Sequence, residues 1–145
     1  MNEQLVSKQT AVLAKEKGFN EETYDYFNQN DECETSLSKE YFNKGIHTSE
    51  NIITISCPTQ SLLQKWLREK HNLYICISAE FYKTGINHLV QILCYNPNLT
   101  ESDYYDNDKC TWMYGDNGQF DTYEEALEFG LQKALTFVPE KFNKI

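Results

Sequence analysis

The sequence predicts a single α+β domain spanning residues 1–145, with three helices packed on a small antiparallel sheet of three or four strands. Residues 58–71 carry apolar side chains at helical spacing, and residues 73–82 alternate apolar and polar side chains as a half-buried strand does. Residues 122–138 repeat the helical pattern behind a capping box. The 40% hydrophobic and 14% aromatic content is typical of a folded globular chain.

The first helix is expected over residues 7–18. Ser7 is its N-cap candidate, and Val6 and Ala11 are spaced for a hydrophobic staple across the first turn. Gly18 suits the left-handed position that follows many helices, because it has no Cβ.

Two weaker segments follow that helix. Residues 24–27 are short and aromatic, which favours an edge strand. Residues 28–51 are dominated by acids, Ser and Asn with little apolar content, so we expect a long loop there. The isoleucines of residues 52–55 then indicate a short strand that leads into the central helix.

The central helix, residues 58–71, is the most strongly specified element. Pro58 is compatible with its first turn, and Ser56 or Thr59 can cap it. Trp66 is the largest side chain of its apolar stripe, and we expect the other elements to pack around it. The stripe consists of Leu62, Leu63, Trp66 and Leu67.

The sequence of the C-terminal half predicts a β-hairpin, a third strand and a C-terminal helix. Residues 73–82 and 87–95 flank a turn at Lys83–Gly85, and residues 111–114 form the next strand. Thr122 and Glu125 are spaced as a capping box for the last helix. One row of that helix carries small residues, which predicts a close approach to the sheet. The row is Ala126, Gly130, Ala134 and Val138.

The net charge of −9 is concentrated in one stretch. Residues 101–128 hold nine acids and one base, giving −8, whereas the rest of the chain holds 13 acids and 12 bases, giving −1. Such a surface repels phosphate backbones and attracts cations or basic proteins.

The acidic stretch is therefore the candidate binding site. Its carboxylates would steer a basic protein, and its adjacent tyrosines would supply contact area. We expect one acidic face that holds a basic protein partner, with nucleic acid disfavoured and no membrane contact. Its residues are Asp103, Tyr104, Tyr105, Asp106, Asp108, Asp116, Asp121 and Glu124.

The compartment is expected to be the cytoplasm. The apolar runs are only a few residues long, too short to span a bilayer, and the N-terminus lacks a basic start followed by an apolar region. Five cysteines, an odd number without a C-x-x-C pair, argue against a disulfide framework.

The chain offers no recognisable catalytic motif, and we assign no catalytic residue, metal or cofactor. Cys57 precedes a helix, where its thiol pKa would be lowered, but no His is spaced to act as its base. Glu80 is the only acid inside a predicted strand, and no second carboxylate is identified to complete a hydrolase pair. A small enzyme with an unrecognised site is therefore an alternative without positive support.

Two groups of residues are candidates for a metal site, and neither has the spacing typical of one. Cys76, His88 and Cys94 could meet on the hairpin, but they lack the close ligand pairs of zinc sites. The acids at residues 103–108 lack the order of a calcium-binding EF-hand loop.

A nucleic-acid-binding regulator of the winged-helix type is the other alternative. The helix at residues 58–71 followed by the hairpin at residues 73–95 loosely matches a recognition helix and a wing. The net negative charge argues against this function. The basic residues that would face phosphate are Lys65, Arg68, Lys70 and Lys83.

Three motifs resemble a group of small uncharacterised proteins of gut bacteria and their phages. They are residues 6–19, the helix PTQSLLQKWLRE at residues 58–69, and TYEEALExGL at residues 122–131. The resemblance implies an intracellular setting and a phage or mobile-element origin. That group has no assigned activity, cofactor or catalytic residue, so the resemblance supplies no functional residue. It usually has a small residue such as Ala at the position of Cys57, which argues against a shared nucleophile.

Overall fold

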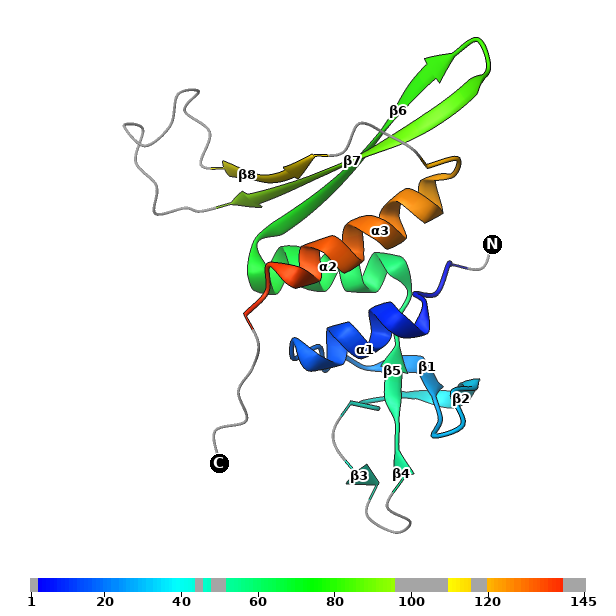
Figure 1. Cartoon of the computed structure of the whole chain (residues 1–145). Helices are drawn as coiled ribbons and strands as arrows, with labels where there is room; N and C mark the ends of the chain where they lie inside the picture. The colour runs from blue at the N-terminus through cyan, green and yellow to red at the C-terminus, as the bar shows by residue number, and fades with distance from the viewer. Residues whose placement is uncertain (1–2, 44–45, 48–51, 96–109, 116–119, 140–145) are drawn as a thin grey trace. The chain divides into compact units, whose positions relative to one another are not determined.

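The computed structural model describes residues 3–43, 46–47, 52–95, 110–115 and 120–139. Its three helices and antiparallel strands confirm the predicted α+β class (Figure 1). In chain order the elements are α1 (Lys8–Glu16), β1 (Thr23–Phe27), β2 (Cys33–Glu40), β3 (Ile46–His47), β4 (Ile52–Ile53), β5 (Ile55–Cys57), α2 (Gln60–His71), β6 (Leu73–Tyr82), β7 (Gly85–Tyr95), β8 (Cys110–Gly115) and α3 (Tyr123–Thr136).

The strands are distributed differently from the single small sheet that the sequence predicts. In the described residues they form two three-stranded antiparallel sheets, with the orders β2-β1-β5 and β6-β7-β8, and a two-stranded ribbon of β3 and β4. None of the helices in those residues has the length and apolar content needed to cross a bilayer.

The chain is organised as two compact units. The first unit comprises residues 1–63 and 135–145, and the second unit comprises residues 64–134. Two compact units can be parts of one domain, so the single-domain organisation stays a prediction.

Helix α1 of the first unit has both of the caps that the sequence predicts. The Ser7 side chain accepts a hydrogen bond from the backbone N–H of Thr10 at 3.2 Å. At the other end Gly18 has a φ of 94°, and the N–H of Phe19 reaches back to the carbonyl of Ala14 at 2.9 Å. This is the hydrogen bond of a Schellman motif, and it buries the Phe19 ring against the end of the helix.

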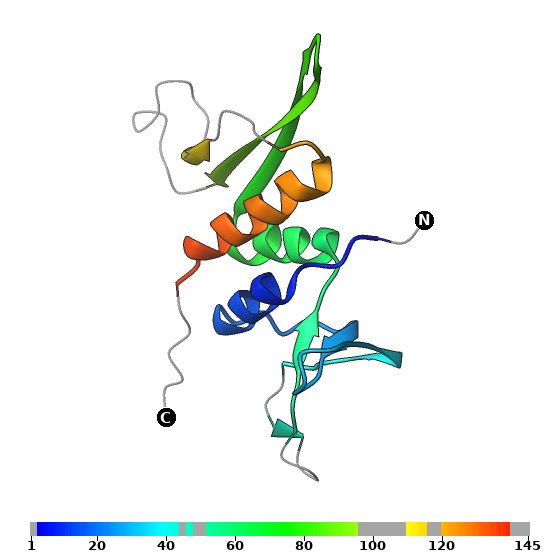
Figure 2. The ribbon, with the colours of Figure 1, turned by 45° about the vertical axis from the view of Figure 1, so that its right-hand side comes forward.

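Strand β1 is the central strand of the first sheet, so the prediction of an edge strand at residues 24–27 is wrong. It pairs with β2 on one side and with β5 on the other. Figure 2 shows α1 running beside β5 within this unit. The N-terminal segment adds one more connection, because the N–H of Val6 donates to the carbonyl of Pro58 at 3.0 Å.

The long loop predicted over residues 28–51 is also wrong, since β2 occupies residues 33–40 of it and β3 lies at residues 46–47. The physical reason is that β2 is exposed on both faces, so it carries no alternation of apolar and polar residues. Leu37, its one apolar residue apart from Cys33, is fully exposed. The strand forms because its backbone pairs with β1, and its own side chains give no signal of burial.

Helix α2 begins at Gln60, two residues later than predicted. Thr59 is its cap, and its side-chain oxygen accepts from the N–H of Leu62 at 3.2 Å. Pro58 lies before the helix because its carbonyl is engaged by Val6 in an extended bridge. The predicted apolar stripe is largely confirmed: Leu63, Trp66 and Leu67 are buried, and Leu62 is half-buried.

The second unit contains the predicted hairpin and third strand. Strands β6 and β7 pair without interruption from Leu73–Cys94 to Tyr82–Gly85, and β8 pairs with the other edge of β7. One residue, Asn72, joins α2 to β6 with a left-handed φ of 55°. The strand therefore starts directly where the helix ends.

Helix α3 lies against one face of this sheet, as both ribbon views show (Figures 1 and 2). A Cβ on Gly130 would be 2.8 Å from Cγ2 of Ile75 and 3.1 Å from Cγ1 of Val90. Only glycine fits at that distance, which confirms the close approach predicted from the row of small residues. Thr122 caps the helix by accepting from the N–H of Glu125 at 3.1 Å.

Trp66 is a large aromatic side chain of the buried core, so its removal should affect stability strongly. It is 6% exposed, and its ring meets the imidazole of His71 edge-on, with ring centroids 4.6 Å apart. The expected contacts of Trp66 with the hairpin and the last helix stay a prediction. Trp66→Ala should lower the free energy of unfolding by about 3–5 kcal/mol, the range for removing a large aromatic from a core. Urea denaturation measures this change, and an unchanged midpoint would reject Trp66 as a core residue.

Candidate functional site

The predicted acidic face falls mostly on residues that the structure does not describe. Two of its members, Asp121 and Glu124, are exposed at the start of α3. The binding face itself stays a prediction. The members outside the described residues are Asp103, Tyr104, Tyr105, Asp106, Asp108 and Asp116.

The hairpin does not assemble the metal site weighed from the sequence. Cys76 is opposite Gln91 and lies on the outer face of the sheet, whereas His88 and Cys94 lie on the face shared with Leu73 and Ala79. In the parts of the chain that the structure describes, no three metal-ligating side chains come together.

The two side chains considered for catalysis are placed in unrelated settings. Cys57 is 1% exposed, and its thiol donates to the backbone carbonyl of Val6 at 3.6 Å, which is a structural contact. Glu80 is exposed on the hairpin and accepts a hydrogen bond from the Tyr82 hydroxyl. Neither arrangement supplies a general base beside a nucleophile.

The basic residues of the winged-helix alternative are on the surface of the second unit. Lys65 and Lys70 are exposed on α2, where Lys65 is 4.0 Å from the carboxylate of Glu69. Arg68 is half-buried, and Lys83 is exposed at the hairpin turn. Nucleic-acid binding by these residues stays untested.

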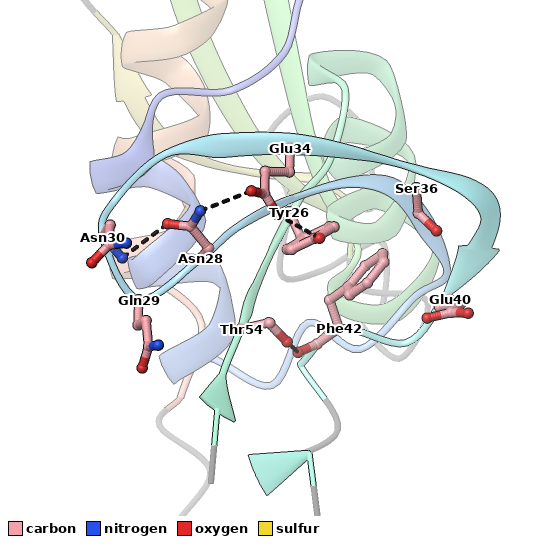
Figure 3. Close-up of a pocket in the computed structure, with 9 residues that line it drawn as sticks. All are labelled: Tyr26, Asn28, Gln29, Asn30, Glu34, Ser36, Glu40, Phe42 and Thr54. Carbon is pink, nitrogen blue, oxygen red and sulfur yellow. Dashed lines mark hydrogen bonds between the residues drawn. The ribbon is translucent and has the colours of Figure 1, made fainter. Parts of the chain in front are cut away.

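A pocket in the first unit is the clearest concave site in the described residues (Figure 3). It has a volume of about 340 Å³ and lies where β1, β2 and the segments that follow them meet. Its lining combines two aromatic rings, two carboxylates and several uncharged polar groups, and none of the described residues that line it is Lys, Arg or His. The residues are Tyr26, Asn28, Gln29, Asn30, Glu34, Ser36, Glu40, Phe42 and Thr54.

Strand pairing positions the first carboxylate of this pocket. Tyr26 and Glu34 are opposite one another in the β1–β2 pair and therefore share a face of the sheet. One oxygen of Glu34 accepts from the Tyr26 hydroxyl at 2.6 Å, and the other accepts from the side-chain amide of Asn28 at 3.1 Å. Both bonds are visible in Figure 3, and together they orient the carboxylate.

The turn between β1 and β2 holds Asn28 in place. Its side-chain oxygen accepts from the N–H groups of Asn30 at 2.8 Å and Glu32 at 3.1 Å, while Asp31 adopts a left-handed φ of 63°. Asn and Asp favour such turns because their side chains bond to nearby backbone. The side-chain amide group of Asn28 is then left to donate to Glu34.

The aromatic wall is a stacked pair. The rings of Tyr26 and Phe42 have centroids 4.3 Å apart and planes 21° from parallel. Phe42 is buried, and its carbonyl accepts from the Thr54 hydroxyl at 2.7 Å, which holds the segment after β2 against the start of β5. Phe42 therefore belongs to the buried interior of the unit, whereas Tyr26 is half-buried.

Negative charge gathers around Tyr26. Its pKa is raised above the ordinary value of 10.0, first by the hydrogen bond to Glu34, then by burial and by the charges of Glu34 and Glu40. Both carboxylates act on the same phenol, so they create one region of negative potential.

The sequence gives little sign of this site, because seven of its nine lining residues fall in the segment expected to be a loop. Strand β2, which supplies Glu34, Ser36 and Glu40, is polar almost throughout, so its composition resembles that of a surface loop and gives no usable signal. Leu37, the one apolar residue of β2 apart from Cys33, is fully exposed and so gives no signal of a buried face. The pairing with β1, which the sequence does not indicate, is what turns these residues into a pocket.

Comparisons with protein-family models, with curated proteins and with solved structures find no match to this chain.

The raised pKa of Tyr26 predicts a specific loss of stability in alkali. The phenol loses its proton more readily in the unfolded chain, so its contribution is complete below about pH 10 and is lost as pH rises through the folded pKa. Tyr26→Phe should flatten this fall in the free energy of unfolding, measured by urea denaturation across the alkaline range. Tyr24→Phe removes an exposed phenol from the same strand and is the control; equal slopes for the two variants would contradict the assignment.

Proposed function

We propose that the protein is an intracellular binding protein that holds a cationic side chain, lysine or arginine, of a basic protein partner in the pocket of the first unit. The observation that carries the proposal is the pair of carboxylates around a stacked aromatic pair, with no base in the lining. A phage or mobile-element origin, which the sequence motifs imply, fits an accessory protein of this kind.

The charge of the lining selects the ligand. Glu34 and Glu40 would attract an ammonium or guanidinium group and repel phosphates and carboxylates. Glu34 is already oriented by two hydrogen bonds, so a cation that reaches it finds an acceptor whose ordering cost has been met during folding. A charge-assisted hydrogen bond to such a group is about twice as strong as a neutral one.

The size and wall of the pocket suit a side chain. Its volume of about 340 Å³ is at the lower end of the range for small-molecule sites, about 300–1,000 Å³. The rings of Tyr26 and Phe42 can cover the aliphatic part of a long basic side chain, and the face of a ring attracts the cation itself. Gln29 and Asn30 also line the pocket, and their side-chain amides can donate to and accept from a peptide backbone.

A lysine-rich peptide tests this function, with binding measured by calorimetry. Glu34→Gln and Glu40→Gln keep the shape of each side chain and remove its charge. Each should raise the dissociation constant about tenfold, the equivalent of one charge-assisted hydrogen bond. Acetylation of the peptide lysines should have a similar effect, because it removes the cation.

Glu32→Gln is the matched control. Glu32 is exposed in the same turn but does not line the pocket, and its replacement changes the net charge by the same amount. It should change the dissociation constant by less than about twofold, as expected for a screened surface charge. The proposal fails if the Glu32 variant binds as weakly as the Glu34 variant, or if the acetylated peptide or a neutral sugar binds as well as the lysine peptide.

The acidic stretch of residues 101–128 would add electrostatic steering to this function. Its charge of −8 acts over a distance of about a Debye length, and it raises the rate of encounter more than the final affinity. The adjacent Tyr104 and Tyr105 would add contact area once the partner is bound.

Replacing Asp103, Asp106 and Asp108 with Asn should slow association with a basic partner and weaken its salt dependence, because the steering charge is reduced. Replacing Tyr104 and Tyr105 with Ala should instead speed dissociation. Stopped-flow kinetics at several salt concentrations separates the two effects. Wild-type association and dissociation rates in both variants would show that this stretch is solvated surface only.

A further inference from the structure

Strand β6 is an unprotected edge of the second sheet. The strand order β6-β7-β8 leaves one side of β6 without a strand partner among the described residues. Its ten residues contain no Pro, Lys or Arg, and the pairing with β7 has no bulge. Natural proteins usually protect such an edge with one of these features, because an exposed edge is a template for another strand.

Two hydrogen bonds determine which backbone groups of β6 face outward. The N–H of Tyr95 in β7 donates to the carbonyl of Asn72 at 2.8 Å. The backbone N–H and C=O groups of the even-numbered residues of β6 therefore point toward β7. The side chain of Gln64 donates to the carbonyl of Ile75 from the other side, at 3.1 Å. The odd-numbered residues therefore direct their N–H and C=O groups away from the sheet.

Gln64 divides this edge into a covered part and an open part. It occupies the outward carbonyl of Ile75 near the start of the strand. Beyond it, no described residue bonds to the outward groups of Ile77, Ala79 and Phe81. The open edge therefore runs over residues 77–81 and is centred on Ala79.

We propose that the open edge pairs with the same edge of a second copy of this chain, antiparallel and with Ala79 opposite Ala79. This register matches every outward group with one on the other copy, because Ile77 then exchanges hydrogen bonds with Phe81 of the second copy. The two sheets become one continuous six-stranded sheet around a two-fold axis, an isologous contact.

The side chains on the helix-covered face complement one another in this register. Phe81 is 77% exposed, although it lies on the same face as Ile75 and Ile77, on which α3 packs. Pairing places it beside Ile77 of the second copy, which removes apolar surface of both residues from water.

The other face of the sheet is complementary as well. Tyr82 of one copy comes opposite Cys76 of the other, next to an apolar hollow of about 320 Å³. Glu80 comes opposite Ser78 and not opposite a second acid, so the pairing brings no like charges together. The hollow is lined by Tyr74, Cys76, Leu93 and Tyr95.

Charge does not oppose the contact locally. The chain carries −9, but residues 72–84 hold one acid, Glu80, and one base, Lys83. A pairing of five residues is smaller than an interface of standard size, which buries about 1,200–2,000 Å², so we expect a dimer that dissociates on dilution.

Cysteine cross-linking tests the register. In hydrogen-bonded antiparallel pairs the Cα atoms are about 5.5 Å apart, within the range that a disulfide bridges, so Ala79→Cys should cross-link to itself on mild oxidation. Ser78→Cys is the control, because residues 78 of the two copies would be diagonal neighbours about 7–8 Å apart. Both changes are made in a chain whose exposed Cys33 and Cys76 are serine, and peptide mapping identifies the linked residue.

Ala79→Pro tests the hydrogen bonds themselves. Proline removes an N–H that faces outward and is tolerated on an edge strand, so the fold should persist while the dimer dissociation constant rises about tenfold or more. Ala79→Ser keeps the N–H and is the control. Sedimentation equilibrium measures the dimer, and circular dichroism checks the fold.

The proposal is supported by a wild-type dimer that Ala79→Pro weakens and by cross-linking that is fast at residue 79 and slow at residue 78. It is overturned if the wild-type chain stays a monomer at its highest soluble concentration, or if residue 78 cross-links as fast as residue 79. If Ala79→Pro does not fold, the two cysteine variants decide the question by themselves.

Discussion

Strand β1 pairs with β2 on one side and with β5 on the other, and the first unit depends on this two-sided pairing. The pairing places Tyr26 between Glu34 and Ser56, on one face of the sheet. The Tyr26 side chain then meets both the carboxylate of Glu34 and the stacked ring of Phe42. Among the described buried side chains, the Ser56 hydroxyl on this face is the one that has no hydrogen-bond partner.

The second unit depends on the alternating direction of the backbone N–H and C=O groups along its strands. Because each residue of a strand directs its polar groups to one side, a single bond such as that of Asn72 to Tyr95 determines the direction for the whole of β6. The same alternation places Ile75 and Val90 under α3, where Gly130 permits the helix to approach. The register of the β6–β7 pair thus determines both the sheet face that packs against α3 and the backbone groups that are open at the edge of β6.

The sequence predicts well those elements whose signal is local. The caps of α1, the hairpin of residues 73–95 and the small residue at Gly130 follow from hydrogen-bonding side chains, alternation and size, which act within a few residues. It fails for β2 and for the central place of β1, because those depend on pairing between distant segments. The candidate pocket is missed for the same reason: Glu34 and Glu40 are ordinary surface acids until β1 is placed beside them.

The exposure of β2 on both faces has a consequence for how this protein can change over generations. Its side chains take almost no part in the buried interior, yet Glu34, Ser36 and Glu40 line the pocket. Under the proposed function, substitutions there would alter the preferred ligand and leave the interior around Phe19 and Phe27 as it is. Under the proposed function, the charged part of the recognition site would be encoded by residues outside the buried interior, so new specificities would be accessible by small mutational steps that leave folding intact.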